Sequence, residues 1–158
     1  MNWIEAFDRV IGHEGGYVFN RDDPGGETKW GISKRSYPHL KIASLTRDDA
    51  KQIYYNDFWL PVGFLLKPAV MYQVFDAAVN HGAGNAIRML QRAIGVADDG
   101  HWGPISNAAY ASMELNDVLF RFLAERGDFM AKLSTFPTFG RGWTRRIFQN
   151  LRYAAEDN

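Results

Sequence analysis

The 158-residue sequence contains no cysteine, so neither a disulfide framework nor a cysteine-ligated metal site is available to it. The four histidines, at positions 13, 39, 81 and 101, show none of the short paired spacings typical of zinc ligands. No serine lies in a Gly-x-Ser-x-Gly motif, which argues against a serine nucleophile. We therefore expect a fold that is stable without cross-links, with no metal and no cofactor.

Long apolar runs and an excess of one charge are also absent. No segment approaches the roughly 18 apolar residues of a membrane-spanning helix. Glu5, Asp8 and Arg9 interrupt the first apolar residues, so a signal peptide is not predicted. Eighteen basic and 18 acidic side chains leave a formal net charge of zero, which gives no electrostatic reason to expect nucleic acid or stable membrane insertion.

The sequence does contain enough apolar material for one folded domain, with 46% hydrophobic and 15% aromatic residues. Apolar residues recur with the period of an α-helix over most of the chain, which predicts a mainly α fold. We expect Asn2 to cap the first helix, Thr46 and Asp49 to form a capping box, and Pro68 to begin another helix. The predicted helices cover about residues 3–14, 46–60, 68–81, 85–94 and 116–133, and a last one carries residues 143–151.

The first predicted helix carries an acid at its end. Glu14 lies three residues after Ile11 and seven after Phe7, in phase with an apolar stripe, and Gly15 and Gly16 would stop the helix after it. Partial burial and the negative end of the helix dipole both favour the protonated carboxyl, which raises its pKa as a general acid requires. The alternative is an ordinary surface glutamate.

Two short β-prone runs follow, at 17–19 and 29–32, joined by a stretch rich in turn residues. We predict a small β-hairpin that returns Asp22, Asp23 and Thr28 towards the end of the first helix. Two carboxyl groups flanking a bond, one protonated and one ionised, are the equipment for cleaving a glycosidic linkage. The alternative is an ordinary turn, in which each aspartate hydrogen-bonds its own backbone.

The runs Glu-Gly-Gly-Tyr at 14–17 and Asp-Asp-Pro-Gly-Gly-x-Thr-x-x-Gly-Ile-Ser at 22–33 resemble the signature of glycoside hydrolase family 108, the lysozyme-like muramidases of phages and prophages. The resemblance implies a mainly α (α+β), lysozyme-like helical fold with a small β-hairpin after the first helix. It also implies hydrolysis of the β-1,4 bond between N-acetylmuramic acid and N-acetylglucosamine in peptidoglycan, with Glu14 as the catalytic acid.

In the broader lysozyme-like superfamily, an aspartate and a threonine complete the catalytic site. Asp23 lies nine residues after Glu14, as that pattern expects, but Thr28 then follows one residue early. If Asp22 takes the place of Asp23, the spacing to Thr28 fits the pattern but the spacing from Glu14 does not. The resemblance therefore implies a catalytic set of Glu14, Asp23 and Thr28, with Asp22 as the alternative second carboxylate or a substrate-binding residue.

Two aromatic and two polar side chains are further candidates for substrate binding. Tyr17 and Trp30 would form walls that face the sugars, although both are equally suited to a core. Asn80 and His81 come at the end of a predicted helix, before Gly82, where polar groups would face a cleft. The alternative for this pair is helix capping.

The second half of the chain resembles the peptidoglycan-binding half that accompanies the family 108 signature. The resemblance rests on residues 75–82, on Leu-Gln-x-x-x-Gly at 90–95 and on Asp-Gly-x-x-Gly-Pro at 99–104. Because no flexible linker is visible, we expect one compact unit over 1–158, with a catalytic lobe at 1–84 and a helical, peptidoglycan-binding-like lobe at 85–158. An independent binding domain is the alternative.

A cluster of arginines near the C-terminus alternates with aromatic residues, which suggests either contact with an anionic glycan or the solvated face of a helix. These arginines are Arg141, Arg145, Arg146 and Arg152.

A phage-type lysin would accumulate in the cytoplasm of the bacterial host and need a holin, or another release route, to reach the periplasm and cell wall. We expect a monomer that acts on peptidoglycan glycan strands. A lytic transglycosylase, which breaks the same bond with a single acid and leaves an anhydro-sugar, is the alternative among enzymes. A noncatalytic peptidoglycan-binding or phage structural protein is the alternative outside them, and the presence of Glu14, both aspartates and Thr28 argues against it.

Overall fold

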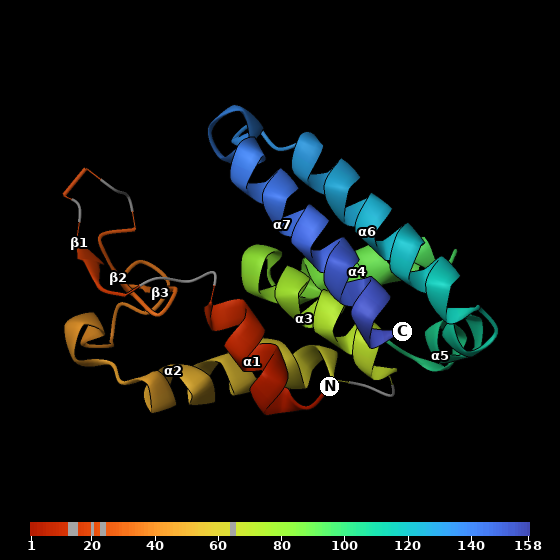
Figure 1. Cartoon of the computed structure of the whole chain (residues 1–158), viewed down its shortest axis with the longest axis horizontal. Helices are drawn as coiled ribbons and strands as arrows, with labels where there is room; N and C mark the ends of the chain where they lie inside the picture. Colours follow the sequence, from red (N-terminus) through yellow and green to blue (C-terminus); the bar gives the residue numbers. More distant parts are fainter. Residues whose placement is uncertain (13–15, 20, 23–24, 64–65) are drawn as a thin grey trace. The chain divides into compact units, whose positions relative to one another are not determined.

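The computed structural model describes residues 1–12, 16–19, 21–22, 25–63 and 66–158 (Figure 1). The described residues divide into two compact units, one of Asn2–Asp57 and one of Phe58–Asn158 together with Met1. The fold is mainly helical with a small antiparallel sheet after the first helix, which confirms the predicted fold class. The predicted single body, with its lobes divided at residue 84, stays a prediction.

Helix α1 (Trp3–Ile11) begins with the expected cap. The Asn2 side chain accepts a hydrogen bond from the Glu5 N–H at 3.0 Å, and the Glu5 carboxylate accepts one from the Asn2 N–H at 2.9 Å. The helix ends at Ile11 with Gly12 as its C-cap, so the predicted end at Gly15 is wrong. The apolar stripe stops at Ile11 and glycine is a poor helix former, which accounts for the earlier end.

The sheet has three strands, β1 (Val18–Phe19), β2 (Glu27–Lys29) and β3 (Ile32–Ser33), in the order β1-β2-β3. Strands β1 and β2 form the predicted hairpin. The second predicted strand, over 29–32, is wrong because Trp30 and Gly31 form a turn that leads into β3. Both have positive φ, 54° and 73°, as a tight two-residue hairpin turn requires.

The rest of this unit packs helices against one another. A short 3-10 helix, η1 (Ile42–Ser44), leads to α2 (Arg47–Tyr54), whose predicted capping box between Thr46 and Asp49 is present. The rings of Phe7 and Tyr54, both buried, meet edge to face at 5.6 Å between α1 and α2. The π-helix η2 (Tyr55–Trp59) then crosses the division between the units at Asp57, and the 3-10 helix η3 (Leu60–Val62) belongs to the second unit.

The second unit is an all-helical bundle around α3 (Pro68–His81), in which every residue from 69 to 78 is buried. Helices α4 (Ala83–Ala93), α6 (Leu115–Ala131) and α7 (Phe136–Asp157) pack against α3, and α6 and α7 lie side by side (Figure 1). Helix α5 (Pro104–Ala111) was not predicted, because its only buried residues are Ser106 and Tyr110 and it therefore shows no apolar stripe. Among the described helices, none has the length and apolar character needed to cross a membrane.

Candidate active site

Two of the predicted catalytic residues, Glu14 and Asp23, lie outside the described residues. The structure describes the strands between and after them. Asp22 is exposed, and it precedes the segment that leads into β2. Thr28 is half-buried at the centre of β2, the middle strand, where it pairs with Val18 of β1 and Ser33 of β3. Both neighbouring strands therefore hold the backbone of Thr28 in place.

The register of the sheet separates its two faces. Thr28 shares one face with Val18 and Ser33, whereas Glu27 shares the other face with Phe19, because successive side chains of a strand point to opposite sides. The Tyr17 hydroxyl donates a hydrogen bond to Glu27 Oε1 at 3.1 Å, so Tyr17 reaches the Glu27 face. The predicted sugar contact of Tyr17 and the predicted catalytic role of Thr28 thus belong to different faces of the sheet.

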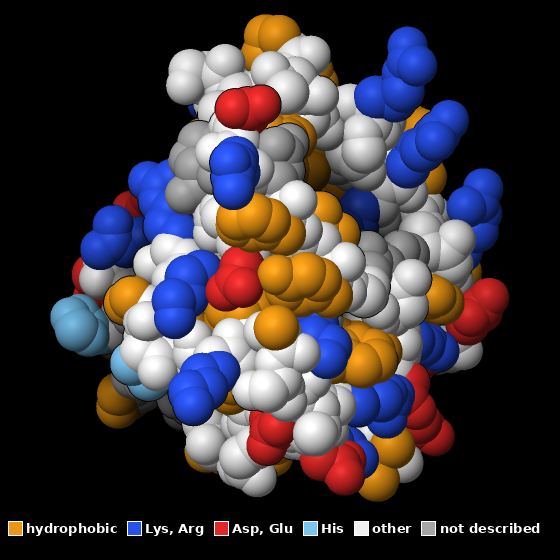
Figure 2. All heavy atoms as spheres, turned by 90° about the vertical axis from the view of Figure 1, so that its left-hand side faces the viewer, with side chains coloured by type: hydrophobic (Ala, Val, Ile, Leu, Met, Phe, Trp, Pro, Cys, Tyr) orange, Lys and Arg blue, Asp and Glu red, His pale blue; other side chains and the backbone are white. Residues whose placement is uncertain are grey.

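Glu27 is a carboxylate that the sequence analysis missed. Partial desolvation, followed by the hydrogen bond to Glu27 and its negative charge, raises the pKa of Tyr17 above its ordinary value. The sequence signal for this residue was its position directly before Thr28. Tyr17, Val18 and Phe19 all expose much of their side chains, 46%, 56% and 55%. Figure 2 shows a face on which apolar side chains reach the surface between lysines and arginines.

Both the side chain and the backbone of Trp30 form hydrogen bonds within the first unit. Its indole N–H donates a hydrogen bond to the Leu45 carbonyl at 3.2 Å, and its carbonyl accepts one from the Tyr54 hydroxyl at 2.9 Å. The side chain is half-buried. These bonds hold the β2–β3 turn against α2 and the segment before it, which is a structural role. The predicted contact of Trp30 with sugar stays a prediction.

Asn80 and His81 lie in the second unit, in the last turn of α3. The His81 ring packs against Phe129 at 5.2 Å and Trp143 at 6.4 Å, and its Nε2 is buried with no hydrogen-bond partner among the described residues. Burial, and then the positive charge of Arg126, lower the pKa of His81 to about 4. His81 is therefore neutral at pH 7. Asn80 is half-buried.

His81 also borders a polar hollow of about 360 Å³ in the second unit. The other residues that line it are Gly82, Gly84, Asn85, Arg88, Asp99, Gly100 and His101. Several of these belong to the motifs that resemble a peptidoglycan-binding half. Whether the hollow takes part in substrate binding stays a prediction.

A buried ionic network in the second unit was not predicted. The Asp76 carboxylate accepts hydrogen bonds from Arg126 at 2.6 Å, from Arg146 at 2.8 Å and from the Asn150 amide at 2.7 Å. Burial alone would raise the pKa of Asp76, but the charges of Arg126 and Arg146 outweigh it and keep the pKa well below its usual range. The network joins α3 to α6 and α7. Arg146 therefore belongs neither to a solvated face nor to a glycan contact.

No group of three or more histidine or acidic side chains that could hold a metal ion occurs in the part of the chain that the structure describes.

The comparisons with known proteins agree with the motifs of the first unit. A family model described as glycosyl hydrolase 108 matches residues 7–82, which include Glu14, Asp22, Asp23 and Thr28. The chain is also similar to the solved structure of Brucella abortus SagA, with 32% sequence identity and a TM-score of 0.88 over 98% of this chain and 94% of that one. No curated protein matches the sequence. This extent of likeness shows that the chain belongs to the glycosyl hydrolase 108 family and is a glycosyl hydrolase.

Proposed function

We propose that this glycosyl hydrolase acts on bacterial peptidoglycan and hydrolyses the β-1,4 bond between N-acetylmuramic acid and N-acetylglucosamine. The observation that carries the proposal is the family match over residues 7–82. This range contains both motifs, the first with Glu14 and the second with Asp23 and Thr28. Two carboxyl groups beside one glycosidic bond are the groups that such hydrolysis requires.

In this proposal, Glu14 is the general acid that protonates the leaving oxygen. Asp23, or Asp22 in its place, activates the attacking water or stabilises the positive charge that develops on the sugar ring. Thr28 positions that water. The position of Thr28 in the middle strand supports this role, because β1 and β3 both pair with β2 and hold its backbone in place. A side chain that positions a water molecule must itself be held in a fixed position.

The direct test is the digestion of purified peptidoglycan by the full chain and by Glu14→Gln. The amide keeps the shape of the side chain but has no proton to transfer, so the rate should fall by about two to four orders of magnitude. Glu156→Gln, at an exposed position near the C-terminus, is the matched control and should keep full activity. Retention of more than about a tenth of the rate by Glu14→Gln would contradict the assignment.

Mass spectrometry of the released fragments identifies the reaction. Hydrolysis adds one water to each cleaved bond and leaves a reducing N-acetylmuramic acid. A transglycosylase leaves an anhydro-sugar instead, and its product is lighter by one water. Anhydro products would replace the proposed hydrolysis by that reaction, and the absence of any product would favour a binding protein.

We propose in addition that the chain reaches its substrate as a phage-type endolysin does, from the host cytoplasm through a holin or another release route, and acts as a monomer. Expression in a bacterial host tests this, because lysis should then require a holin or a permeabilised inner membrane. Lysis without either would contradict the proposed route.

A further inference from the structure

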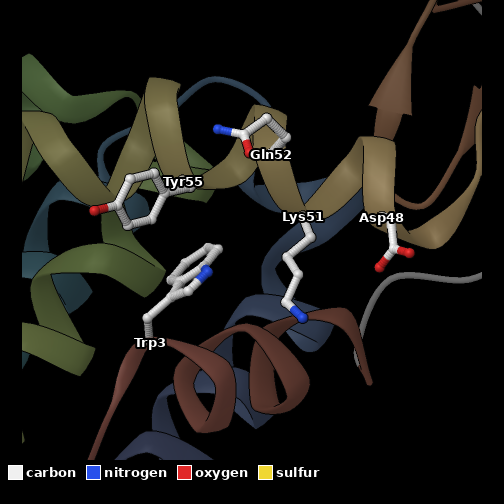
Figure 3. Close-up of a pocket in the computed structure, with 5 residues that line it drawn as sticks. All are labelled: Trp3, Asp48, Lys51, Gln52 and Tyr55. Atoms are coloured by element: carbon white, nitrogen blue, oxygen red, sulfur yellow. The ribbon is translucent and has the colours of Figure 1, made fainter.

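A groove of about 570 Å³ lies between α1 and α2, inside the unit Asn2–Asp57 (Figure 3). This volume falls in the range of about 300–1,000 Å³ that is usual for small-molecule sites. The residues that line the groove are Trp3, Asp48, Lys51, Gln52 and Tyr55. None of them belongs to the motifs assigned to catalysis.

The spacing of these residues explains why they meet. Asp48, Lys51 and Tyr55 follow the i, i+3, i+7 pattern, so they form one stripe of the helical segment that contains α2 and its continuation. The stripe differs from the one that faces the core, which carries Ala50 and Tyr54. Figure 3 shows Tyr55 beside Trp3, the first residue of α1, and shows Lys51 and Asp48 pointing towards the rest of α1.

Ring contacts hold the aromatic floor of the groove in place. The Trp3 ring meets Tyr55 edge to face at 5.2 Å and meets Phe7 at 5.5 Å, and Phe7 is fully buried. An ion pair between Asp8 and Arg47 joins α1 to α2. Trp3 and Tyr55 remain half-buried, so part of each ring faces the groove. The floor is therefore rigid and aromatic.

The two charged side chains of the groove have no other partner in the described part of the chain. Neither the Asp48 carboxylate nor the Lys51 ammonium group makes a hydrogen bond or an ion pair with another described residue. Gln52 Nε2 donates to Asn56 Oδ1 at 3.2 Å, which orients the amide and leaves its carbonyl oxygen as an acceptor. One cation, one anion and one amide thus offer donors and acceptors with no net charge.

This combination matches the two kinds of surface on a sugar ring. The C–H face of a pyranose packs on aromatic rings, whereas its hydroxyl and acetamide groups need donors and acceptors at the edge. A groove without net charge favours an uncharged ligand over a polyanion. We propose that the groove binds an uncharged, N-acetylated sugar unit of a glycan strand, as a second binding site of the catalytic unit. The identity of the strand as peptidoglycan rests on the proposed function.

The groove is separate from the catalytic motifs in the sequence, since none of the residues that line it lies between positions 14 and 33. Trp3 is the first residue of α1 and Ile11 the last, which at a rise of 1.5 Å per residue places them about 12 Å apart. The motif with Glu14 follows the Ile11 end. We expect a strand bound in the groove to be retained on the enzyme between cleavage events.

The test uses the full chain with Glu14→Gln, labelled with ¹⁵N, and chitotetraose, the tetramer of N-acetylglucosamine, as the probe. The indole N–H signal of Trp3 is identified by its loss in Trp3→Phe. Addition of chitotetraose should shift this signal in a saturable manner. Lys51 and Gln52 are not buried, so both can be replaced without disturbing the aromatic floor of Trp3 and Tyr55. The double variant Lys51→Ala and Gln52→Ala should weaken the binding of chitotetraose, measured at Trp3, about three- to tenfold. Circular dichroism checks that this variant is folded.

Lys41→Ala is the matched control, because Lys41 is an exposed lysine of the same unit outside the groove, and it should bind as the parent does. An unchanged Trp3 signal, or equal binding by the double variant and the parent, would overturn the proposal. Its failure is separable from that of the proposed function. If chitotetraose shifts the Trp3 signal but the parent enzyme does not cleave peptidoglycan, only the proposed function is refuted. If the parent enzyme cleaves peptidoglycan but the Trp3 signal does not shift, only the proposed sugar binding by the groove is refuted.

Discussion

The adjacent residues Asp22 and Asp23 differ in the residue that follows each of them. Pro24 follows Asp23 directly in the sequence, and a proline biases the residue before it to an extended conformation, so we expect Asp23 to be the more restricted of the two. Asp22 has no such restraint. The nine-residue spacing from Glu14 also favours Asp23 as the second carboxylate.

Asp23→Asn should therefore lose activity on peptidoglycan by about a hundredfold or more, whereas Asp22→Asn should lose it only severalfold, through a weakened turn. Digestion rates of the two variants, measured beside Glu14→Gln, give the comparison. Circular dichroism shows whether each is folded. Equal and small losses at both positions would mean that Glu14 acts without a second carboxylate, as in a transglycosylase.

His81 gives a prediction about pH. Its pKa of about 4 in the folded chain lies below the ordinary value of 6.5, so the unfolded chain binds a proton first as the pH falls. The contribution of neutral His81 to stability is thus complete above pH 6.5, declines as the pH falls from 6.5 to 4, and changes no further below that. NMR titration should show the His81 ring neutral at pH 5.

His81→Gln removes this titration, so its urea midpoint should change less between pH 6.5 and 4 than that of the parent. His39→Gln, at an exposed position, is the matched control. A His81 that titrates near 6.5 would contradict the buried setting described above.

At the scale of elements, we expect substitutions on the two faces of β2 to have different effects on activity. Thr28 and Glu27 are neighbours in the chain but point to different sides of the sheet, and only Thr28 is assigned a part in the chemistry. Thr28→Val keeps the shape and removes the hydroxyl, so it should lower peptidoglycan digestion about tenfold or more.

Glu27→Gln should leave digestion within about threefold of the parent, and it should move the pKa of Tyr17 back towards its ordinary value. Ultraviolet difference titration against Tyr17→Phe measures that shift. A large loss of activity in Glu27→Gln with little loss in Thr28→Val would assign the chemistry to the other face of the sheet.

For the molecule as a whole, the charges inside the second unit matter more for stability than those on its surface. Asp76→Asn would leave Arg126 and Arg146 without their buried counter-charge, at a cost of about 3–5 kcal/mol in the free energy of unfolding. Urea denaturation should show this as a large fall in the midpoint.

Asp98→Asn is the matched control for Asp76→Asn. It breaks a pair with Arg92 at 2.9 Å, but both side chains are partly exposed, so the midpoint should barely move. Similar midpoints for the two variants would contradict the role assigned to the buried network.

The local elements of this fold could be predicted from the sequence because their signals lie within a few residues of one another. The caps at Asn2 and Thr46, the proline that begins α3 and the hairpin between β1 and β2 depend on neighbouring residues alone. The order of acids, glycines and threonine between 14 and 33 is likewise a property of the chain, and it is enough to indicate the family.

Tertiary structure decided what each of these residues meets. The partner of Arg146 lies 70 positions away in α3, the indole of Trp30 is bonded to a carbonyl before α2, and Glu27 finds its partner in Tyr17 through the strand register. Local periodicity contains no information about such pairs, since they form only when separate elements pack. The sequence by itself therefore determined most of the helices, the hairpin and the family, whereas packing decided which side chains are buried, which face of the sheet each one takes, and where a groove remains open.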